Sequence, residues 1–530
     1  MTRKRFAIRT FLALSLVLSL ILSACGGGAA KTSAPTSTKE STPTPSGPKL
    51  KDTFVFAINR EPDNFDPVTQ DGNPNIWTFM NVYQTLIRLN TAGTDFEPDL
   101  AENWKAAPDG LTWTFNLRKD AKFSNGTGVT ARDVVFSLTR AKTLKAPWQW
   151  ALDDVAKIEA KDDYTVVITL SQKSAPFLSN ISLFSNAILS ADFYKDAPPE
   201  KFSNQLMGSG PYMLTEWKKG EYVTLKANPH YYEKGLPKTP NVKLIYIPDD
   251  DTRIIKLQSG EVDGIDAPPF ARVAELKANP NFDMQLNPST AVSHLSLNVR
   301  KGPLANTDFR KALAYALDRE GIVKAVLFGN GKSATSFLPE TTLYFDKDLK
   351  AYNFDLNKAK ELMAKSGVPA GTKLEILFPA GNQVRQQIAT VAKDMWSKLG
   401  LDVQLNPMDS AAATARYKAD DFQIFVTGWT NDIPDPSQLA SYELGYKESK
   451  SYHSGYQSDK MDALIAAGVR ELDTAKRAQI YKEIQALAIE DSPLLWLYYS
   501  PYTLTLSKKV EGFRQMTTGP WVFKNVVVKQ

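Results

Sequence analysis

The alternation of strand-like and helix-like segments along residues 50–530 limits the folds open to this chain more than any other feature. Short runs rich in β-branched and aromatic residues predict strands, and longer runs with apolar residues three and four apart predict helices. In the first part of the chain, these patterns predict strands at Thr53–Asn59 and Leu111–Arg118 and helices at Ile76–Leu89 and Thr130–Ala141. Asp133, three residues after Thr130, indicates a capping box at the start of the last helix. A mixed α/β fold is therefore expected.

The same patterns continue to the C-terminus. Strands are expected at Tyr164–Leu170, Tyr222–Lys226, Val242–Ile247, His294–Val299, Leu374–Phe378 and Phe422–Val426. Helices are expected at Asp308–Asp318, Asn357–Lys365, Gln383–Leu399 and Ala475–Ile489. In the second half, long helices lead back to short apolar strands, which predicts a partly parallel sheet there. About 480 residues at ~150 per domain indicate roughly three domains.

Residues 1–24 have the layout of a secretory signal peptide. Four basic residues precede an apolar run of 12 residues, Phe11–Leu22, which is too short to span a bilayer. The run leads into Leu22-Ser23-Ala24-Cys25, which resembles the lipobox of bacterial lipoproteins. We therefore expect Cys25 to be lipidated and to become the first residue of the mature chain.

The residues after the signal peptide are expected to form a tether. Cys25 is the single cysteine, so no disulfide bridge or cysteine-based metal site can form within one chain. The following residues are mostly Gly, Ser, Thr, Ala and Pro, a composition that cannot bury enough apolar surface to fold. Residues 25–50 are therefore expected to be a lipidated, disordered segment that holds a folded body outside the membrane, with the lipid as its only membrane attachment.

The formal net charge of +5 does not indicate a nucleic-acid partner. Four positive charges lie in residues 1–24, which leaves +1 for the mature chain. Elsewhere, basic and acidic residues are interspersed, as on an ordinary solvated surface. We expect neither nucleic-acid binding nor a polybasic membrane patch.

The sequence offers little for catalysis. Its three histidines, His230, His294 and His453, occur singly and without the spacing of a metal site, so neither a metal nor another cofactor is expected. Gly208-Ser209-Gly210-Pro211 lacks the spacing of a serine nucleophile and is typical of a turn. Gly331-Lys332-Ser333 lacks the first glycine of a phosphate-binding loop, because residue 326 is a valine. An enzyme is not expected.

The chain is instead rich in aromatic residues, with 10 Trp, 20 Tyr and 26 Phe, and most of these belong to the core. Trp429 is different, because it follows Gly428 after the predicted strand Phe422–Val426, where open α/β sheets bring ligands. The acid Asp432 comes three residues later, before a proline-rich turn. A purely structural interpretation is also open, in which Asp435-Pro436 starts a helix and Asp432 is solvated in the turn before it.

A series of short motifs runs through the chain from about residue 50. They are Glu61-Pro62 to Asp66-Pro67, Pro98–Trp104, Asp109–Phe115, Lys122-Phe123, Ala131–Ser137, Gly208–Tyr212, Asn228-Pro229 with Tyr231-Tyr232, Gly260–Asp263 and Ala312–Arg319. In this order and spacing, the chain resembles the extracytoplasmic solute-binding proteins of dipeptide and oligopeptide ABC importers, solute-binding protein family 5. The lipoprotein signal agrees with the resemblance.

The resemblance implies a type II periplasmic-binding-protein fold with two lobes, a two-crossing hinge and an additional inserted domain. By analogy, lobe I comprises residues 51–95, 213–295 and 500–530, the inserted domain II comprises 96–212, and lobe II comprises 296–499. The crossings are expected near His294–Val299 and Leu497–Ser500. The resemblance also implies a monomeric, non-enzymatic lipoprotein of the cell envelope that binds short peptides and delivers them to an ABC permease.

In peptide-binding members of the family, the acid of a Trp-x-x-Asp segment receives the α-ammonium group of the ligand. Gly428-Trp429-Thr430-Asn431-Asp432 reproduces this segment, so the resemblance assigns these residues to the ligand and Asp432 to its N-terminus. Asp71-Gly72-Asn73 matches the loop through which the other lobe offers its backbone, and Gly72 permits close approach. The same three residues also fit a turn without a ligand role.

Two departures from the family pattern leave the cargo open. His453 stands where the family often has Asn followed by an aromatic residue, and no basic residue is identified for the ligand carboxylate. Relatives of this fold also carry oligosaccharides, nickel or haem, so a non-peptide cargo is the alternative within the family. Outside the family, the alternatives are a surface-anchored hydrolase and an envelope lipoprotein without a ligand.

Overall fold

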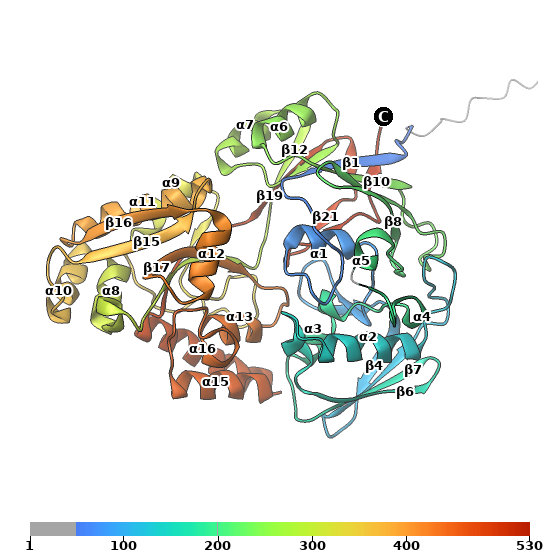
Figure 1. The fold of residues 1–530 in the computed structure, drawn as a ribbon, viewed down its shortest axis with the longest axis horizontal. Coiled ribbons are helices and arrows are strands. Elements are labelled where there is room, and N and C mark those ends of the chain that lie inside the picture. Colours follow the sequence, from blue (N-terminus) through green and yellow to red (C-terminus); the bar gives the residue numbers. More distant parts are fainter. Residues whose placement is uncertain (1–48, 199) are drawn as a thin grey trace, which may run out of the picture. The chain divides into compact units, whose positions relative to one another are not determined.

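The structure is a computed structural model that describes residues 49–198 and 200–530 (Figure 1). The predicted signal peptide, Cys25 and nearly all of the predicted tether therefore lie outside the described residues. Within them, strands and helices are mixed along the whole chain, which confirms the predicted α/β class.

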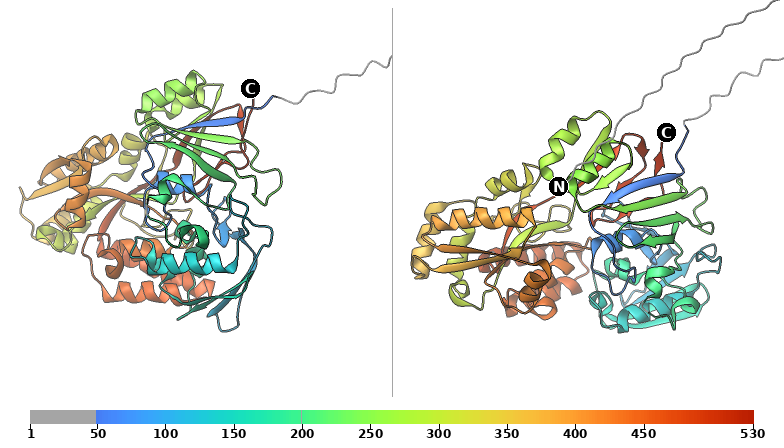
Figure 2. Two further views of the ribbon diagram at one scale, coloured as in Figure 1. Left: turned by 45° about the vertical axis from the view of Figure 1, so that its right-hand side comes forward. Right: turned by 45° about the horizontal axis from the view of Figure 1, so that its top comes forward.

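A seven-stranded sheet is built from strands that lie far apart in the sequence, in the order β12-β19-β11-β1-β10-β9-β8. These strands are β1 (Thr53–Ile58), β8 (Tyr212–Lys218), β9 (Tyr222–Ala227), β10 (Asn241–Tyr246), β11 (Gly264–Asp266), β12 (Phe282–Asn287) and β19 (Tyr502–Ser507). Phe54 and Phe56 of β1 fill the core on one face, and Ala57 faces the other. Helices α6 (Asp250–Gln258) and α7 (Val273–Ala278), green in Figures 1 and 2, pack beside β11 and β12 and share the core of Ala57.

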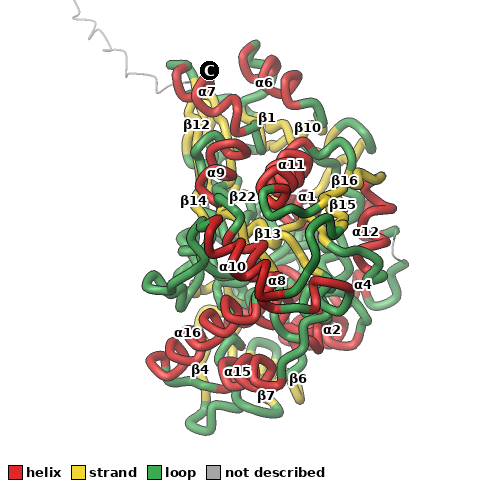
Figure 3. Tube along the Cα trace, turned by 90° about the vertical axis from the view of Figure 1, so that its left-hand side faces the viewer, coloured by secondary structure: helices red, strands yellow, loops and turns green. Residues whose placement is uncertain are grey.

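A six-stranded sheet has the order β14-β18-β13-β17-β15-β16. Its strands are β13 (Ala291–Leu297), β14 (Lys332–Ser333), β15 (Lys373–Pro379), β16 (Asp402–Met408), β17 (Ile424–Thr430) and β18 (Leu494–Tyr499). Strand β15 pairs parallel with both β16 and β17, which confirms the predicted partly parallel sheet. Helices α8 (Thr307–Tyr315), α9 (Arg319–Leu327), α10 (Leu356–Ser366) and α11 (Gln383–Ser397) share a core with this sheet, and Figure 3 shows α8 and α10 side by side.

A four-stranded antiparallel sheet, β4-β5-β7-β6, is covered by α2. The elements are β4 (Ala101–Ala106), β5 (Thr112–Leu117), β6 (Val155–Asp162), β7 (Thr165–Leu170) and α2 (Ala131–Thr143). Thr130 N donates to Asp133 Oδ2 (2.9 Å), and the capping box predicted from these two residues is present. Val134 and Leu138 of α2 pack in one core with Phe115.

The remaining elements are short or peripheral. The two-stranded pairs are β2 (Ile87–Leu89) with β3 (Phe96–Pro98), β20 (Val510–Glu511) with β23 (Val527–Val528), and β21 (Arg514–Gln515) with β22 (Trp521–Val522). The other helices are α1 (Asn73–Phe79), α3 (Phe177–Ile181), α4 (Ala191–Tyr194), α5 (Lys201–Asn204), α12 (Ser410–Lys418), α13 (Ser437–Glu443), α14 (Tyr446–Ser449), α15 (Asp459–Arg470) and α16 (Thr474–Asp491). Four 3-10 helices complete the described residues: η1 (Gln149–Leu152), η2 (Phe184–Asn186), η3 (Phe270–Arg272) and η4 (Gly302–Ala305).

The predicted helix Ile76–Leu89 is wrong beyond Phe79, and its last three residues form strand β2 instead. Helix α1 ends at Phe79, because the backbone beyond it bonds to a distant segment. Val82 O accepts from Gly210 N (2.8 Å), and Asn81 O accepts from Tyr212 N (3.0 Å). A Cβ on Gly208 would lie 2.0 Å from Val82 O, so the predicted turn at residues 208–211 contains glycine where two backbones touch.

The chain crosses between the seven-stranded and six-stranded sheets twice. Residues 288–290 lead from β12 to β13, and residues 500–501 lead from β18 to β19. Ser289 Oγ donates to the Ser500 carbonyl oxygen, so the two crossings are bonded to each other. Both segments expected at the crossings lie mostly inside strands, because residues 294–297 belong to β13 and residues 497–499 belong to β18. The first crossing therefore precedes His294–Val299, and the second overlaps Leu497–Ser500 only at Ser500.

Candidate functional site

Strand β17 has one edge that is only partly paired. Strand β13 pairs with β17 along its whole length, whereas β15 pairs only with Ile424 and Phe425. On the β15 side, residues 426–430 therefore have no strand partner in the described part of the chain. Backbone N–H and C=O groups on such an edge can pair with an extended ligand.

Gly428 and Trp429 lie on this open part of β17. A Cβ on Gly428 would lie 2.7 Å from the Val292 carbonyl oxygen, so glycine is required next to β13. Trp429 stacks on Tyr442, with ring centroids 5.1 Å apart, and meets Tyr452 edge to face at 5.4 Å. These contacts fix the indole ring at the end of the strand. Its buried N–H has no hydrogen-bond partner among the described residues.

The next two residues hold the turn after the strand. Thr430 pairs with Ala291 of β13. Asn431 is fully buried, and its Nδ2 donates to the carbonyl oxygens of Ile433 (2.6 Å) and Asp435 (3.1 Å). The structure therefore gives Asn431 a supporting position behind the site rather than an exposed one.

Asp432 is a partly exposed acid held by Gln438. Its backbone N–H donates to Gln438 Oε1 (2.8 Å), and Gln438 Nε2 donates to Asp432 Oδ2 (2.9 Å). Burial raises the pKa of Asp432 to about 7, although the hydrogen bond from Gln438 favours the ionised form. In the described structure, no basic side chain lies within ion-pair distance of this carboxyl group, so a cationic ligand group can bind there.

The neighbouring acid, Asp435, is fully paired. Arg477 donates to both of its carboxylate oxygens (2.6 and 2.8 Å), and both side chains are buried. Asp435 Oδ1 also accepts from Ser437 N (2.9 Å) at the start of α13. The role of holding the start of this helix therefore falls to Asp435, which leaves Asp432 without a capping role.

Asp432 lines a cavity of about 350 Å³. Ile76, Trp77 and Phe79 of α1 line the same cavity, so an acid that follows the six-stranded sheet meets a helix packed on the core of the seven-stranded sheet. Of the predicted site residues that the structure describes, Asp432 alone lines this cavity.

Asp71, Gly72 and Asn73 lie at the start of α1. Asp71 is exposed, Gly72 is the N-cap residue with φ −87°, and Asn73 is the first helical residue. A Cβ on Gly72 would lie 3.2 Å from Asn75 Nδ2, so the backbone is crowded on that side. Just before them, the Gln70 carbonyl oxygen accepts from Trp148 Nε1. These contacts hold the loop in place. None of them tests whether residues 71–73 bind the ligand, so that role stays a prediction.

Comparison with known proteins identifies the family. The model of the bacterial extracellular solute-binding proteins, family 5, matches residues 95–451. This chain belongs to that family.

Individual relatives agree with this assignment. The chain is 33% identical over 475 residues to the probable D,D-dipeptide-binding periplasmic protein DdpA of Escherichia coli K12, which covers 87% of this chain and 91% of the relative. It is 29% identical to haem-binding protein A of Haemophilus influenzae, over 98% of this chain and 99% of that protein. The solved structure of the periplasmic binding protein DppA from Helicobacter pylori, in complex with the peptide STSA, covers 90% of this chain and 98% of its own, with a TM-score of 0.80 and 27% identity.

The family assignment confirms two predictions. The fold is that of a periplasmic binding protein, and the protein is an extracytoplasmic solute-binding protein of the ABC-transporter type rather than an enzyme. Among residues 49–198 and 200–530, every helix is too short or too polar to span a bilayer.

Sequence reasoning misses one basic residue of this family 5 solute-binding protein, Arg385 in the first turn of α11. Its guanidinium carbon lies 5.9 Å from the centre of the Phe425 ring, beside the start of β17. Burial lowers the pKa of Arg385, and the positive charge of Arg60 acts in the same direction. In the described part, no acid lies within ion-pair distance of Arg385. The sequence around Arg385 does not reveal that it lacks an acidic partner, because its neighbours in space come from other segments of the chain.

Two of the three histidines of the family 5 protein, His294 and His453, lie beside acids. His453 Nδ1 lies 3.2 Å from Asp420 Oδ1. His294 and Glu443 are both fully buried, and His294 Nδ1 lies 3.6 Å from Glu443 Oε1. Burial lowers the pKa of His294 to about 3 and raises that of Glu443 to about 8, so both are mainly uncharged at neutral pH. Across the described residues, no group of three or more His, Cys, Asp or Glu side chains is placed to hold a metal ion.

Further contacts join residues 147–175 to the chain that follows β17. They run from Ala175 N to Val469 O (2.8 Å), from Arg470 Nη1 to Asp154 Oδ2 (2.6 Å) and from the Tyr442 hydroxyl to Pro147 O (3.3 Å). Trp150 also meets Tyr442 edge to face, with centroids 6.2 Å apart. Because Tyr442 stacks on Trp429, these contacts reach the end of β17.

Proposed function

We propose that this family 5 solute-binding protein captures short peptides beside β17 and delivers them to an ABC permease for import. The observation that carries the proposal is the open edge of residues 426–430, which leads to Asp432, an acid without a basic partner in the described structure. A peptide that adds to this edge as a strand forms backbone hydrogen bonds irrespective of its sequence. Its α-ammonium group then meets the Asp432 carboxylate.

Arg385 supports the proposal from the other end of the ligand. A guanidinium group binds a carboxylate through two parallel hydrogen bonds, and Arg385 lacks an acidic partner among the described residues. Tyr452 lies close enough to Arg385 for the guanidinium charge to act on the pKa of its hydroxyl, which burial raises to about 12, and this uncharged hydroxyl donates to Gly428 O (3.3 Å). Arg385 is therefore our candidate for the C-terminal carboxylate of a short peptide.

The relatives support a peptide over other cargo. DdpA is named for D,D-dipeptides, and the Helicobacter pylori structure holds a peptide. The relative named for haem keeps a non-peptide cargo as the alternative outcome of the test.

The remaining parts of the proposal rest mainly on the sequence. We place the lobes at residues 51–95, 213–295 and 500–530 and at 296–499, with an inserted domain at 96–212. The three larger sheets support this division, but the first crossing, residues 288–290, favours a lobe boundary before β13 rather than at residue 295. A lipid on Cys25, a tether over residues 25–50 and a monomeric state complete the proposed envelope lipoprotein.

The test is calorimetric titration of the purified protein with dipeptides and with their N-acetylated forms. Removing one member of a buried ion pair costs about 3–5 kcal/mol, so we expect Asp432→Asn to weaken binding by more than about 100-fold. N-acetylation should have a similar effect on the wild type. Asp348→Asn, at an exposed acid outside the site, is the matched control.

Native mass spectrometry of the same protein identifies the cargo that stays bound during purification. A spread of peptide masses supports the proposal. A single sugar, haem or metal mass would overturn the peptide assignment while keeping the family.

A further inference from the structure

Phe270, the first residue of η3, packs against the cores of both large sheets. Its half-buried ring contacts the core that the seven-stranded sheet shares with α6 and α7, and also the core that the six-stranded sheet shares with α8 to α11. Helix α9 contacts η3 directly. One aromatic ring therefore spans two parts of the molecule that the chain itself joins through the crossings at residues 288–290 and 500–501.

This contact and the cavity at Asp432 lie on opposite faces of the seven-stranded sheet. Directly after the second crossing, Tyr502 meets Trp77 of α1 edge to face, with centroids 5.5 Å apart, and Trp77 lines the cavity. The next residue, Thr503, donates from its hydroxyl to the Pro268 carbonyl oxygen (2.8 Å), two residues before Phe270. Because successive side chains of a strand point to opposite faces, β19 separates the cavity from Phe270.

The same separation holds in the six-stranded sheet. Leu495 of β18 faces the core that Phe270 contacts, whereas the next residue, Trp496, faces the core that contains α13, α15 and α16. Trp429, on the open edge of β17, packs against the core of α13. Phe270 and the proposed peptide site are therefore on opposite sides of both sheets.

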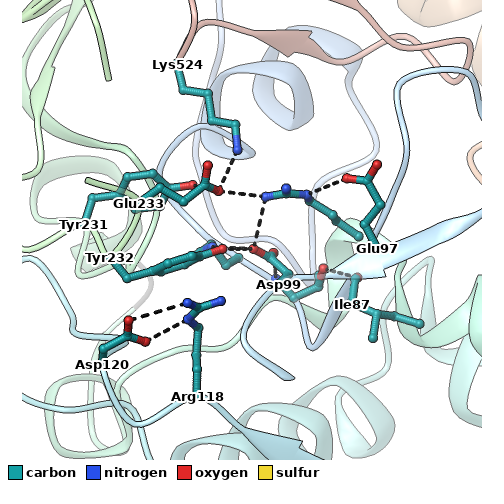
Figure 4. Close-up of polar contacts among 12 residues, drawn as sticks. Ile87, Glu97, Asp99, Arg118, Asp120, Tyr231, Tyr232, Glu233 and Lys524 are labelled. Carbon is teal, nitrogen blue, oxygen red and sulfur yellow. Dashed lines mark hydrogen bonds and ion pairs between the residues drawn. The ribbon is translucent and has the colours of Figure 1, made fainter. Parts of the chain in front are cut away.

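The proposed inserted domain is bound to the part of the chain that contains the seven-stranded sheet (Figure 4). The Tyr232 hydroxyl donates to Asp99 Oδ1 (3.3 Å), and the Arg118 guanidinium carbon lies 3.6 Å from the centre of the Tyr232 ring. Arg88 Nη1 lies 3.8 Å from Asp99 Oδ1 and donates to Glu233 Oε1 (3.1 Å). Tyr232 and Glu233 follow β9 of the seven-stranded sheet, so these contacts link that sheet to the inserted domain.

The contacts of the inserted domain with the chain after β17 lie on the cavity side. Trp150 meets Tyr442 of α13, and Tyr442 stacks on Trp429. The two parts of the molecule thus touch on both sides of the crossings, at α13 on one side and at Phe270 on the other.

We propose that Phe270 opposes closure of the protein over its cargo by stabilising an open form from behind the two crossings. Such short crossings permit rotation of one sheet against the other. A rotation that brings α1 toward α13 moves Phe270 away from the core of α9, so apolar contact is lost at Phe270 when contact with cargo is gained. The inference goes beyond the proposed function, because Phe270 neither lines the cavity nor belongs to β17.

Loss of the Phe270 contact on closure lowers the apparent affinity for cargo. When only a fraction of the molecules is in the form that binds, the observed affinity is reduced by that fraction. Removing the Phe270 ring raises the fraction of closed molecules and leaves every residue that lines the cavity unchanged.

The test is calorimetric titration of the purified full chain with the dipeptide Phe-Ala. Loss of a half-buried ring contact predicts that Phe270→Ala binds Phe-Ala about three- to tenfold more tightly than the wild type does. Phe270→Leu keeps part of the contact and should give a smaller gain. Small-angle X-ray scattering without ligand measures the same balance, and the radius of gyration of Phe270→Ala should be smaller than that of the wild type.

Ile245→Ala is the matched control. Ile245 is also half-buried and, of the cores in the described part of the chain, it packs against that of α6 and α7 alone, so its affinity and radius of gyration should match the wild type. Equal or weaker binding by folded Phe270→Ala and Phe270→Leu, or an equal gain in Ile245→Ala, would overturn the inference and leave the proposed function standing. Absence of peptide binding by the wild type would instead overturn the proposed function, and an unchanged radius of gyration in Phe270→Ala would still overturn the inference.

Discussion

The carboxyl group of Asp432 changes its charge near neutral pH, because burial raises its pKa to about 7. An ammonium ligand needs the ionised form, so binding below pH 7 releases a proton. We expect affinity for Phe-Ala to fall about tenfold per unit at acidic pH, and also to fall above ~8 as the α-ammonium group loses its proton. Calorimetry between pH 5 and pH 9 measures this, and equal affinity at pH 5 and pH 7 would contradict it.

The raised pKa of Asp432 also affects the stability of the protein without a ligand. The folded state holds the Asp432 proton more tightly than the unfolded chain, in which an aspartic acid has a pKa of about 3.9. The contribution of Asp432 to stability is therefore greatest below about pH 4 and is lost as pH rises to about 7. We therefore expect the free energy of unfolding of Asp432→Asn to increase relative to that of the wild type as pH rises from about 4 to about 7. Urea unfolding measures both values, and a difference between them that does not change with pH would contradict the raised pKa.

Asp435 and Arg477 form a buried pair three residues from the proposed ligand contact. Asp435→Asn leaves the buried arginine charge without its partner, so we expect a loss of about 3–5 kcal/mol in the free energy of unfolding. Asp192→Asn is the matched control, because Asp192 and its partner Arg132 are 77% and 63% exposed and their pair should contribute less than about 1 kcal/mol. Equal losses in the two variants, measured by urea unfolding, would refute the argument from burial.

At the scale of elements, the end of α15 is joined to residues 154–175 by Arg470 and by the backbone of Val469. If these contacts help to hold the site closed over its cargo, their loss should speed release. The Asp154–Arg470 pair is partly exposed and contributes at most about 1 kcal/mol, so we expect Arg470→Ala to raise the dissociation rate of Phe-Ala about two- to fivefold. Stopped-flow fluorescence measures this rate, with Arg416→Ala as the control, and an unchanged rate would show that the contact does not retain cargo.

The sequence predicted those helices and strands that are determined by the pattern of their own residues. Helices α10 and α11 and strand β15 follow from their apolar patterns, because their apolar residues meet a core. Strand β17 was predicted two residues too early, at Phe422–Val426; it continues to Thr430, so Trp429 lies within the strand rather than after it. Helix α1 was predicted too long, because its end is decided by backbone bonds to residues 210–212. Asp432 was predicted from its motif, and the structure places it at a cavity, while its ligand role stays a prediction. Arg385, our candidate for the ligand carboxylate, was not predicted, because its lack of an acidic partner depends on segments that only the fold brings together.

At the scale of the whole molecule, the proposed cargo at Asp432 lies beside the turn after β17, a strand of the six-stranded sheet, and beside helix α1. Helix α1 and Ile433 of the turn pack in the core of the seven-stranded sheet. A ligand that binds only the folded state should therefore stabilise the two sheets together. At 100 times its dissociation constant, Phe-Ala should add about 2.7 kcal/mol to the free energy of unfolding in one cooperative transition. Urea unfolding tests this, with N-acetylated Phe-Ala as the control, and equal stabilisation by both peptides would contradict it.

The strand order of the seven-stranded sheet has a consequence for the order of folding. Strand β12 meets the rest of this sheet only through β19, and β19 pairs with both β11 and β12. Residues 502–507 are made long after β1, so a sheet begun near the start of the chain is completed by one of its last strands. Such distant pairings make folding slow. The seven-stranded sheet therefore cannot be completed until β19 has been made, which leaves the nascent chain of this extracytoplasmic protein open for most of its synthesis.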